Sequence, residues 1–210
     1  MAGPDDSFER AAIARGFLRI AGVDEVGRGP LAGPVTAAAV VLDLAKLPEG
    51  LNDSKKLTAR ARDALTKAIH AQAEVSVAHA SVAEIDELNI LRASHLAMVR
   101  AVAALDPAPD YVLIDGNMVP ADLTIAHETI VKGDARSVSV AAASIVAKTC
   151  RDAIMVDLAQ QHPGYGWETN AGYPSKRHIL ALSEIGVTPH HRRSFKPVHN
   201  ILYQDKIVSG

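Results

Sequence analysis

Four acidic side chains stand at points where an apolar run of the sequence gives way to glycine. They are Asp24, Glu25, Asp115 and Asp134. A carboxylate is costly to bury unless something pairs with it, and neighbouring carboxylates in an apolar setting repel each other. Either one pKa of such a pair rises or a divalent cation lies between the two groups. Oxygen ligands suit Mg²⁺ or Mn²⁺, so the pattern predicts a divalent-metal site.

Two of these positions have simpler explanations. Arg28 follows the first two acids and is flanked by glycines, so an ion pair without a metal would also satisfy a buried carboxylate there. Asp134 precedes the expected start of a helix at Ser137, where a negative charge stabilises the helix dipole by about 0.3–1 kcal/mol. The presence of the other acids is what favours metal binding.

The composition of the 210-residue chain is typical of one packed α/β domain. Its single cysteine, Cys150, excludes an internal disulfide and a thiolate metal site, and indicates a reducing compartment. Residues 1–10 lack the pattern of a signal peptide, and no apolar run reaches the ~20 residues of a membrane span. We therefore expect a soluble, cytoplasmic protein.

Charge is distributed unevenly. A net charge of −2 argues against binding nucleic acid through bulk charge alone. Two basic stretches are candidate phosphate contacts, although the later part of the first, from Arg60 to Lys67, fits a solvated helix face better. The stretches consist of Lys55, Lys56, Arg60, Arg62 and Lys67, and of Lys176, Arg177, Arg192, Arg193 and Lys196.

The first half of the chain predicts a sheet with helices on it. Residues 17–24 and 35–42 are rich in Val, Ile and Ala and predict an antiparallel hairpin. Thr58 is expected to cap a helix, residues 74–80 alternate as a third strand, and Ser81 begins a capping box that opens another helix.

The next elements predict parallel pairing. A helix over residues 90–104 precedes a short apolar strand at 111–114, and a helix between strands implies a crossover. Residues 129–131 predict one more strand, and Ser137 the cap of a helix reaching Gln160. The sheet is therefore expected to be mixed.

The last quarter predicts mostly surface structure. Residues 163–174 are rich in glycine and aromatic side chains and look too polar for the core, and Ser175 should cap the last clear helix, which ends at Gly186. One geometric difficulty concerns Asp24 and Glu25. Adjacent strand residues point to opposite faces, so these two can share a site only at a bulge or a strand end.

Several blocks together resemble bacterial ribonuclease HII, the type 2 ribonuclease H family. They are residues 21–35, 52–57, 114–117, 132–134, 142–148 and 191–195, in the order that the family keeps. The resemblance implies an α/β fold of the ribonuclease H type, with a mixed five-stranded sheet flanked by helices and a small helical C-terminal extension. We expect a flexible segment at 1–16, a catalytic core at 17–160 and a substrate-contacting segment at 161–210.

The resemblance also implies an endonuclease that cleaves the RNA strand of RNA/DNA hybrids. It would nick duplex DNA 5′ of single embedded ribonucleotides, leaving 3′-hydroxyl and 5′-phosphate ends. The four acids match the family's metal positions, where two Mg²⁺ or Mn²⁺ ions would act in phosphodiester hydrolysis.

Further matches concern the substrate. The glycine-arginine-glycine segment Gly27, Arg28 and Gly29 matches the family's sensor of the ribose 2′-hydroxyl, the group that distinguishes RNA from DNA. Tyr173 matches a tyrosine that stacks at the RNA/DNA junction, although an aromatic packed beneath a turn is the simpler alternative. Expected phosphate contacts, again by resemblance, are Ser54, Lys55, Ser144 and Lys148, whereas His191, Arg192 and Arg193 fit a structural role. We expect a monomer without an obligate protein partner.

Other functions fit parts of this pattern. A structure-selective DNA nuclease would keep the fold and change the substrate. A catalytically silent hybrid-binding module would leave four acids facing a polyanion without a purpose. A small-molecule α/β enzyme would need a phosphate-binding or dinucleotide motif, and the sequence contains neither.

Overall fold

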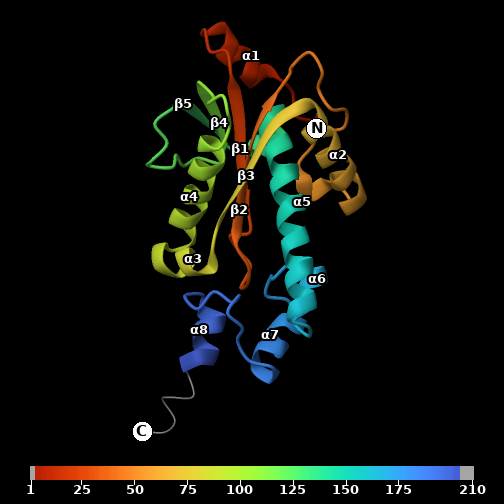
Figure 1. Ribbon diagram of the computed structural model, residues 1–210, viewed down its shortest axis with the longest axis vertical. Coiled ribbons are helices and arrows are strands. Elements are labelled where there is room, and N and C mark those ends of the chain that lie inside the picture. Colours follow the sequence, from red (N-terminus) through yellow and green to blue (C-terminus); the bar gives the residue numbers. More distant parts are fainter. Residues whose placement is uncertain (1–2, 204–210) are drawn as a thin grey trace.

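The structure is a computed structural model that describes residues 3–203, and its centre is a five-stranded mixed sheet (Figure 1). The strands are β1 (Ile20–Val26), β2 (Val35–Leu42), β3 (Ala73–Ala80), β4 (Tyr111–Asp115) and β5 (Ala126–Ile130). They lie in the order β3-β2-β1-β4-β5. Strands β1, β2 and β3 pair antiparallel, whereas β4 and β5 run parallel to β1. The predicted hairpin, the crossover and the mixed sheet are confirmed.

Helices cover both faces of the sheet. One face packs against α2 (Ala59–Gln72) and α5 (Val138–Gln161), and the other against α3 (Val82–Leu88) and α4 (Ile90–Ala103). Figure 1 shows α4 and α5 on opposite sides of the strands. Alanine dominates the contact surface of α5, and this small side chain lets the helix backbone lie close to the sheet.

The predicted caps of these helices are present. Side-chain oxygens of Thr58, Ser81 and Ser137 accept hydrogen bonds from backbone N–H groups in the first turns of α2, α3 and α5. Glu84 completes the capping box of α3. Each cap satisfies a donor that the first turn of a helix leaves unpaired, so the sequence signals fix where these helices begin.

Gly22 allows the closest approach between β1 and α5. A Cβ atom at this position would lie 2.2 Å from the backbone carbon of Ser139 and 2.4 Å from the nitrogen of Val140. Backbone atoms cannot move aside as a flexible side chain can, so only glycine fits. This contact sets the height of α5 above the strand that carries Asp24.

The N-terminal region contains a helix that the sequence analysis does not assign. Helix α1 (Ser7–Ala14) buries Glu9, whose Oε1 accepts hydrogen bonds from the Ser137 hydroxyl and from the N–H and hydroxyl groups of Ser139. The helix is short and polar, so no local sequence pattern indicates it. It is held by a hydrogen bond between Glu9 and Ser137, which are 128 residues apart. Residues 1–2 and 204–210, the outer parts of the predicted terminal segments, lie outside the described residues.

The C-terminal region forms a small helical layer at the far end of α5 (Figure 1). It contains α6 (Trp167–Asn170), α7 (Lys176–Glu184), which Ser175 caps, and α8 (Lys196–Tyr203). The interpretation that residues 163–174 lie outside the core is wrong for residues 165–167, although Tyr173 and Pro174 are exposed. Tyr165 and Trp167 are buried in a hydrophobic cluster with Met155 of α5, because their polar atoms find partners inside the protein.

Two short 3-10 helices complete the fold near the acids, η1 (Ser54–Lys56) and η2 (Gly133–Ala135). Within residues 3–203, no helix combines the length and apolar character that crossing a membrane requires.

The close approach at Gly22 leads to a stability prediction. We expect Gly22→Ala to lower the free energy of unfolding by about 3 kcal/mol, because the added methyl group must push α5 away from β1. Chemical denaturation measures this loss. Gly3→Ala is the matched control, since a Cβ there meets only Leu51 O at 3.8 Å. Equal stability of the two variants would contradict the packing argument.

Candidate active site

Asp24 and Asp115 lie side by side on neighbouring parallel strands. The register of β1 and β4 pairs Val23 with Ile114, and each acid is the next residue of its strand. Both carboxylates therefore come from the point where the β1–β4 pairing ends. Asp24 is 6% exposed, so its carboxylate is largely removed from water.

Asp134 reaches the same region from the turn that links β5 to α5. The N–H of Gly133 donates a 2.7 Å hydrogen bond to Asp115 Oδ1, which ties η2 to the end of β4. Lys132 takes a left-handed conformation with φ of 58°, and this turns the chain into η2. Asp134 is itself buried.

Asp24 and Glu25 do not lie at a bulge. The pairing of β1 with β2 continues without interruption to Val26, so the two side chains start from opposite faces of the strand. Asp24 shares its face with Gly22 and lies on the α5 side. Glu25 can approach the same site only because β4 no longer pairs with β1 beyond Val23.

The acids form an electrostatically strained group. Burial, together with the charges of Glu25 and Asp115, raises the pKa of Asp24 well above its ordinary value, although a hydrogen bond from Ser144 opposes the shift. Burial also raises the pKa of Glu25 and that of Asp134. Folding therefore places negative charge where it is costly unless a cation joins it.

Two cationic side chains offset part of this charge. Arg28 lies 3.2 Å from Glu25 Oε1, so the ion pair considered as an alternative to a metal is present for Glu25. Lys55 Nζ lies 3.6 Å from Asp134 Oδ2. Burial lowers the pKa of Lys55, but the charges of Asp134 and Asp24 raise it on balance. The ion pairs of residues 3–203 include neither Asp24 nor Asp115.

The four acids are not arranged as a complete set of metal ligands. Among residues 3–203, no three acidic, histidine or cysteine side chains lie close enough to hold an ion as they stand. The donors nevertheless fit Mg²⁺ or Mn²⁺, because they are hard carboxylate oxygens and the most buried of them has no cationic partner among the described ion pairs.

The loop that follows β1 is held from inside by two buried arginines. Arg192 donates to the carbonyl oxygens of Gly27 at 2.6 Å and Arg28 at 3.1 Å, and Arg151 donates to that of Pro34. The C=O and N–H of a trans peptide point in opposite directions. The N–H groups of Arg28 and Gly29 therefore point away from Arg192, toward the outside of the loop.

Tyr173 lies against this loop. Its Cε1 atom is 3.2 Å from the place where a Cβ of Gly29 would be, so the absence of a side chain at Gly29 makes room for the ring. Tyr173 is 44% exposed, whereas neighbouring Tyr165 is 2% exposed. The alternative of a ring buried beneath the turn does not fit this exposure.

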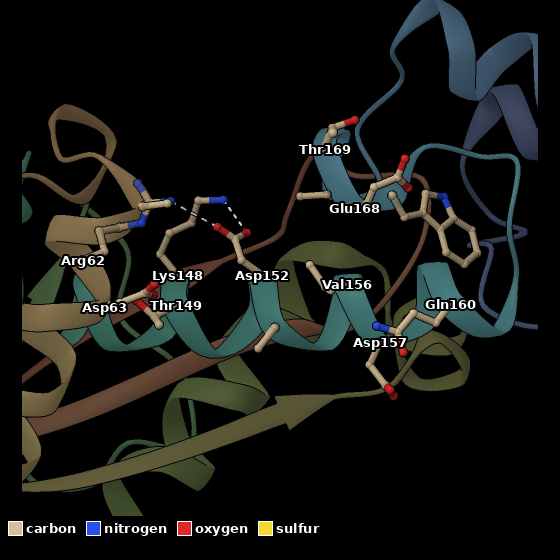
Figure 2. A pocket seen from close by; sticks show the side chains of 14 residues that line it. Arg62, Asp63, Lys148, Thr149, Asp152, Val156, Asp157, Gln160, Glu168 and Thr169 are labelled. Carbon is tan, nitrogen blue, oxygen red and sulfur yellow. Dashed lines mark hydrogen bonds and ion pairs between the residues drawn. The ribbon is translucent and has the colours of Figure 1, made fainter.

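The other expected substrate contacts come from η1 and α5. Ser54 and Ser144 are buried and share a 2.9 Å hydrogen bond, so their hydroxyls join η1 to α5 beneath the acids. Further along, Asp152 binds both Lys148 at 2.5 Å and Arg62 at 3.4 Å (Figure 2). These three side chains line one end of a cavity of about 650 Å³ between α2, α5 and α6.

Comparison with known proteins identifies the family of this chain. The family model described as Ribonuclease HII matches residues 21–198. A curated Ribonuclease HII from Ruegeria sp. (strain TM1040) is 76% identical over 202 residues, which cover 96% of this chain and 88% of the relative. The chain belongs to the ribonuclease HII family. A ribonuclease HII from Cereibacter sphaeroides (strain ATCC 17029 / ATH 2.4.9) is 67% identical, with 98% and 97% coverage.

Family membership establishes the activity at a coarse level. A ribonuclease HII is a hydrolase, an endonuclease that acts on RNA/DNA hybrids. The predicted resemblance is therefore confirmed.

Solved structures support the ribonuclease HII fold. The ribonuclease H2 from Pyrococcus horikoshii OT3 superposes with a TM-score of 0.77 at 27% identity, covering 92% of this chain and all of that chain. The RNase HII of Archaeoglobus fulgidus, solved in complex with PCNA, gives 0.73 at 26% identity, with 87% and 96% coverage. Bst-RNase HIII in complex with Mn²⁺ gives 0.72 at 23%, with 94% and 73% coverage, and shows the shared fold.

Sequence reasoning missed how much of this ribonuclease HII site depends on buried polar side chains. Arg192 was grouped with candidate phosphate contacts, but it is buried and bonded to carbonyl oxygens, so that assignment is wrong. Its structural role was the alternative considered. Arg151 was not singled out, although an arginine among the small, apolar residues of a long helix was the available signal.

The raised pKa of Asp24 has a consequence for stability. Without divalent cations, we expect Asp24→Asn to be more stable than the unaltered protein at pH 7, because the variant removes a buried charge and keeps its shape. The ordinary aspartate pKa is 3.8. The penalty of the charge grows as the pH rises above that value, so the advantage of the variant should vanish below it.

Thermal unfolding in the presence of a chelator, at pH 7 and below pH 3.8, measures this difference. Asp86→Asn is the control, because Asp86 accepts hydrogen bonds from the N–H groups of Arg193 and Ser194 and should lose stability on substitution. A destabilised Asp24→Asn at pH 7 would refute the charge-strain argument.

Proposed function

We propose that this chain nicks duplex DNA on the 5′ side of a single embedded ribonucleotide and leaves 3′-hydroxyl and 5′-phosphate ends. One observation carries the proposal. Asp24 and Glu25 on β1, beside Asp115 at the end of the neighbouring strand β4, directly precede a loop whose backbone N–H groups at Arg28 and Gly29 face outward. Under this proposal, chemistry at a phosphate and recognition of a ribose would occur within a few residues of each other.

Metal binding would involve all four acids. Asp24, Glu25, Asp115 and Asp134 would hold two Mg²⁺ or Mn²⁺ ions, with Asp24 and Asp115 the most direct ligands. Such ions supply an activated water and neutralise the leaving oxygen. The ion pairs of Glu25 with Arg28 and of Asp134 with Lys55 would compete with the cations for these two carboxylates.

The sensor loop would distinguish RNA from DNA. In the segment Gly27, Arg28 and Gly29, the outward N–H groups of Arg28 and Gly29 can bond a 2′-hydroxyl, which only a ribonucleotide carries. Tyr173 would stack on the sugar at the junction, since its exposed ring lies beside Gly29.

Backbone phosphates would contact the surface next to the acids. The phosphate contacts would be Lys55, Lys148, Ser54 and Ser144, although each lysine is paired with a carboxylate and the two buried serine hydroxyls bond each other. The substrates would be RNA/DNA hybrids and ribonucleotide-containing duplex DNA. We propose that the protein acts as a monomer in the cytoplasm, in ribonucleotide excision repair, without an obligate protein partner.

A cleavage assay tests the substrate directly. Three duplexes, one with a single ribonucleotide, one of uniform RNA/DNA hybrid and one of DNA alone, are incubated with Mg²⁺ or Mn²⁺, and the nicks are mapped. The proposal requires a nick 5′ of the ribonucleotide and an intact DNA duplex. Comparable cutting of the DNA duplex would instead identify a structure-selective DNA nuclease.

The metal assignment leads to a prediction about activity. Asp24→Asn and Asp115→Asn should each lower the cleavage rate on the order of 10³-fold or more, since metal assistance contributes several kcal/mol to such reactions. Hybrid binding should change little because shape is preserved. Single-turnover kinetics and equilibrium binding separate the two effects. Asp157→Asn, on the outer side of α5, serves as control, and undiminished rates in the active-site variants would argue against the assignment.

The proposed stacking of Tyr173 leads to a second prediction about activity. Tyr173→Ala should lower cleavage at a single embedded ribonucleotide roughly tenfold, the scale of one lost aromatic stacking contact. Cleavage of a uniform hybrid should fall less, because that substrate offers other junctions and contacts. Tyr173→Phe keeps the ring and should behave like the unaltered protein. An equal loss on both substrates would indicate a packing role.

A further inference from the structure

A buried hydrogen-bonded chain of side chains lies beneath the loop that carries Tyr173. This chain, called the His178 relay, consists of Trp167, His178, His191 and Thr188. Trp167 Nε1 donates to His178 Nε2 at 3.0 Å, and the Nε2 atoms of His178 and His191 are also 3.0 Å apart. His191 Nδ1 accepts from the Thr188 N–H at 2.9 Å. The other nitrogen of His178, Nδ1, lies 2.9 Å from the carbonyl oxygen of Tyr173.

These contacts determine where each imidazole carries its proton. The Thr188 N–H can only donate, so His191 Nδ1 is an acceptor and the proton of neutral His191 is on Nε2. The Trp167 N–H can only donate, so His178 Nε2 is an acceptor, and its single lone pair is shared by the Trp167 N–H and the His191 Nε2–H. The proton of His178 is consequently on Nδ1, and it is donated to the Tyr173 carbonyl.

The relay is enclosed as well as bonded. His178, His191 and Trp167 are all buried, and the Tyr165 ring stacks on Trp167 with centroids 4.9 Å apart. Burial lowers the pKa of His178, and it lowers that of His191 to about 3. Both rings are therefore neutral near pH 7, the state that the hydrogen-bond pattern requires.

The His178 relay holds one peptide group in place, the one that contains the Tyr173 carbonyl. The Tyr173 carbonyl accepts from His178 Nδ1 and from the N–H of Ser175 at 2.8 Å. Two donors thus fix the carbonyl on one side while the ring of Tyr173 extends on the other, next to Gly29.

We propose that His178 is a positioning residue for Tyr173, whose ring it keeps beside Gly29 by holding the Tyr173 carbonyl through Nδ1–H. This inference rests on the proposed function, in which Tyr173 contacts the sugar at the RNA/DNA junction. His178 itself is fully buried and touches no substrate, so its effect reaches the reaction only through Tyr173.

Two substitutions test the roles of the two His178 ring nitrogens, Nδ1 and Nε2, one at a time. In His178→Asn the amide NH₂ takes the place of Nδ1 and still donates to the Tyr173 carbonyl, while Trp167 and His191 lose their acceptor. In His178→Gln the amide oxygen reaches the place of Nε2 and still accepts, while the Tyr173 carbonyl loses a donor. Both variants break one part of the network, so a general loss of stability affects both.

The readout is the ratio of kcat/KM on a single-ribonucleotide duplex to kcat/KM on a uniform hybrid. His178→Gln should lower this ratio about as much as Tyr173→Ala, roughly tenfold, and His178→Asn should leave it within about twofold of the unaltered protein. Equal ratios in the two His178 variants, whether both lowered or both unchanged, would overturn the inference.

A double variant shows whether His178 acts through Tyr173. In a Tyr173→Ala background, adding His178→Gln should lower the ratio no further. An additional, multiplicative loss would overturn the inference. If Tyr173→Ala leaves the ratio unchanged, the proposed function of Tyr173 fails, and this inference fails with it. If Tyr173→Ala lowers the ratio and His178→Gln does not, only the inference fails.

The imidazole tautomers can be measured in the unaltered protein, so this test does not require any variant to fold. Nitrogen-15 NMR of the imidazoles at pH 7 should show His178 protonated on Nδ1 and His191 protonated on Nε2. Trp167 is the single tryptophan of the chain, so its indole N–H gives one resonance with which to locate the relay. Either ring in the opposite tautomer, or doubly protonated, would contradict the inference.

Discussion

The burial of the Asp24 carboxylate is the constraint on which the rest of this structure depends. Its charge lies between the sheet and α5, close to three further acids, and the described ion pairs give it no cation. Gly22 makes this possible, because only a residue without a side chain lets α5 lie low enough for Ser144 to reach Asp24. The fold therefore places a charge where it is unfavourable, and a bound divalent cation would relieve it.

Buried positive charges lie beneath the loop that follows β1. Arg151 and Arg192 are buried cations whose described partners are carbonyl oxygens, and burial lowers their pKa values to about 10 and about 9. Both remain charged at neutral pH. By holding carbonyl groups inward they restrain the loop and turn the N–H groups of Arg28 and Gly29 outward. Rigid donors are what the recognition of one hydroxyl requires.

The sequence was most informative where the signal is local. Caps at Thr58, Ser81 and Ser137, the alternation in β3 and the apolar run before Asp115 depend on near neighbours, and all appear in the structure. The resemblance to the family's blocks indicated which acids to expect at the site. The run from Ala21 through the following glycines is long enough that a chance match is improbable.

The sequence was least informative where partners lie far apart in the chain. Tyr165 and Trp167 look like surface residues until Met155 and His178 surround them. Arg192 looks like a phosphate contact until the carbonyl groups of a loop 165 residues earlier are placed around it. Helix α1 depends in the same way on Ser137. Tertiary hydrogen bonds, which no local pattern encodes, decide each of these cases.

The direct test of the account is the location of Mn²⁺ by anomalous diffraction from crystals of this protein with a ribonucleotide-containing duplex. We expect manganese peaks bounded by the carboxylates of Asp24 and Asp115, with Glu25 and Asp134 completing the site beside the phosphate 5′ of the ribonucleotide. Manganese bound only elsewhere, for instance at Asp152 and Asp157 along α5, would contradict the central claim.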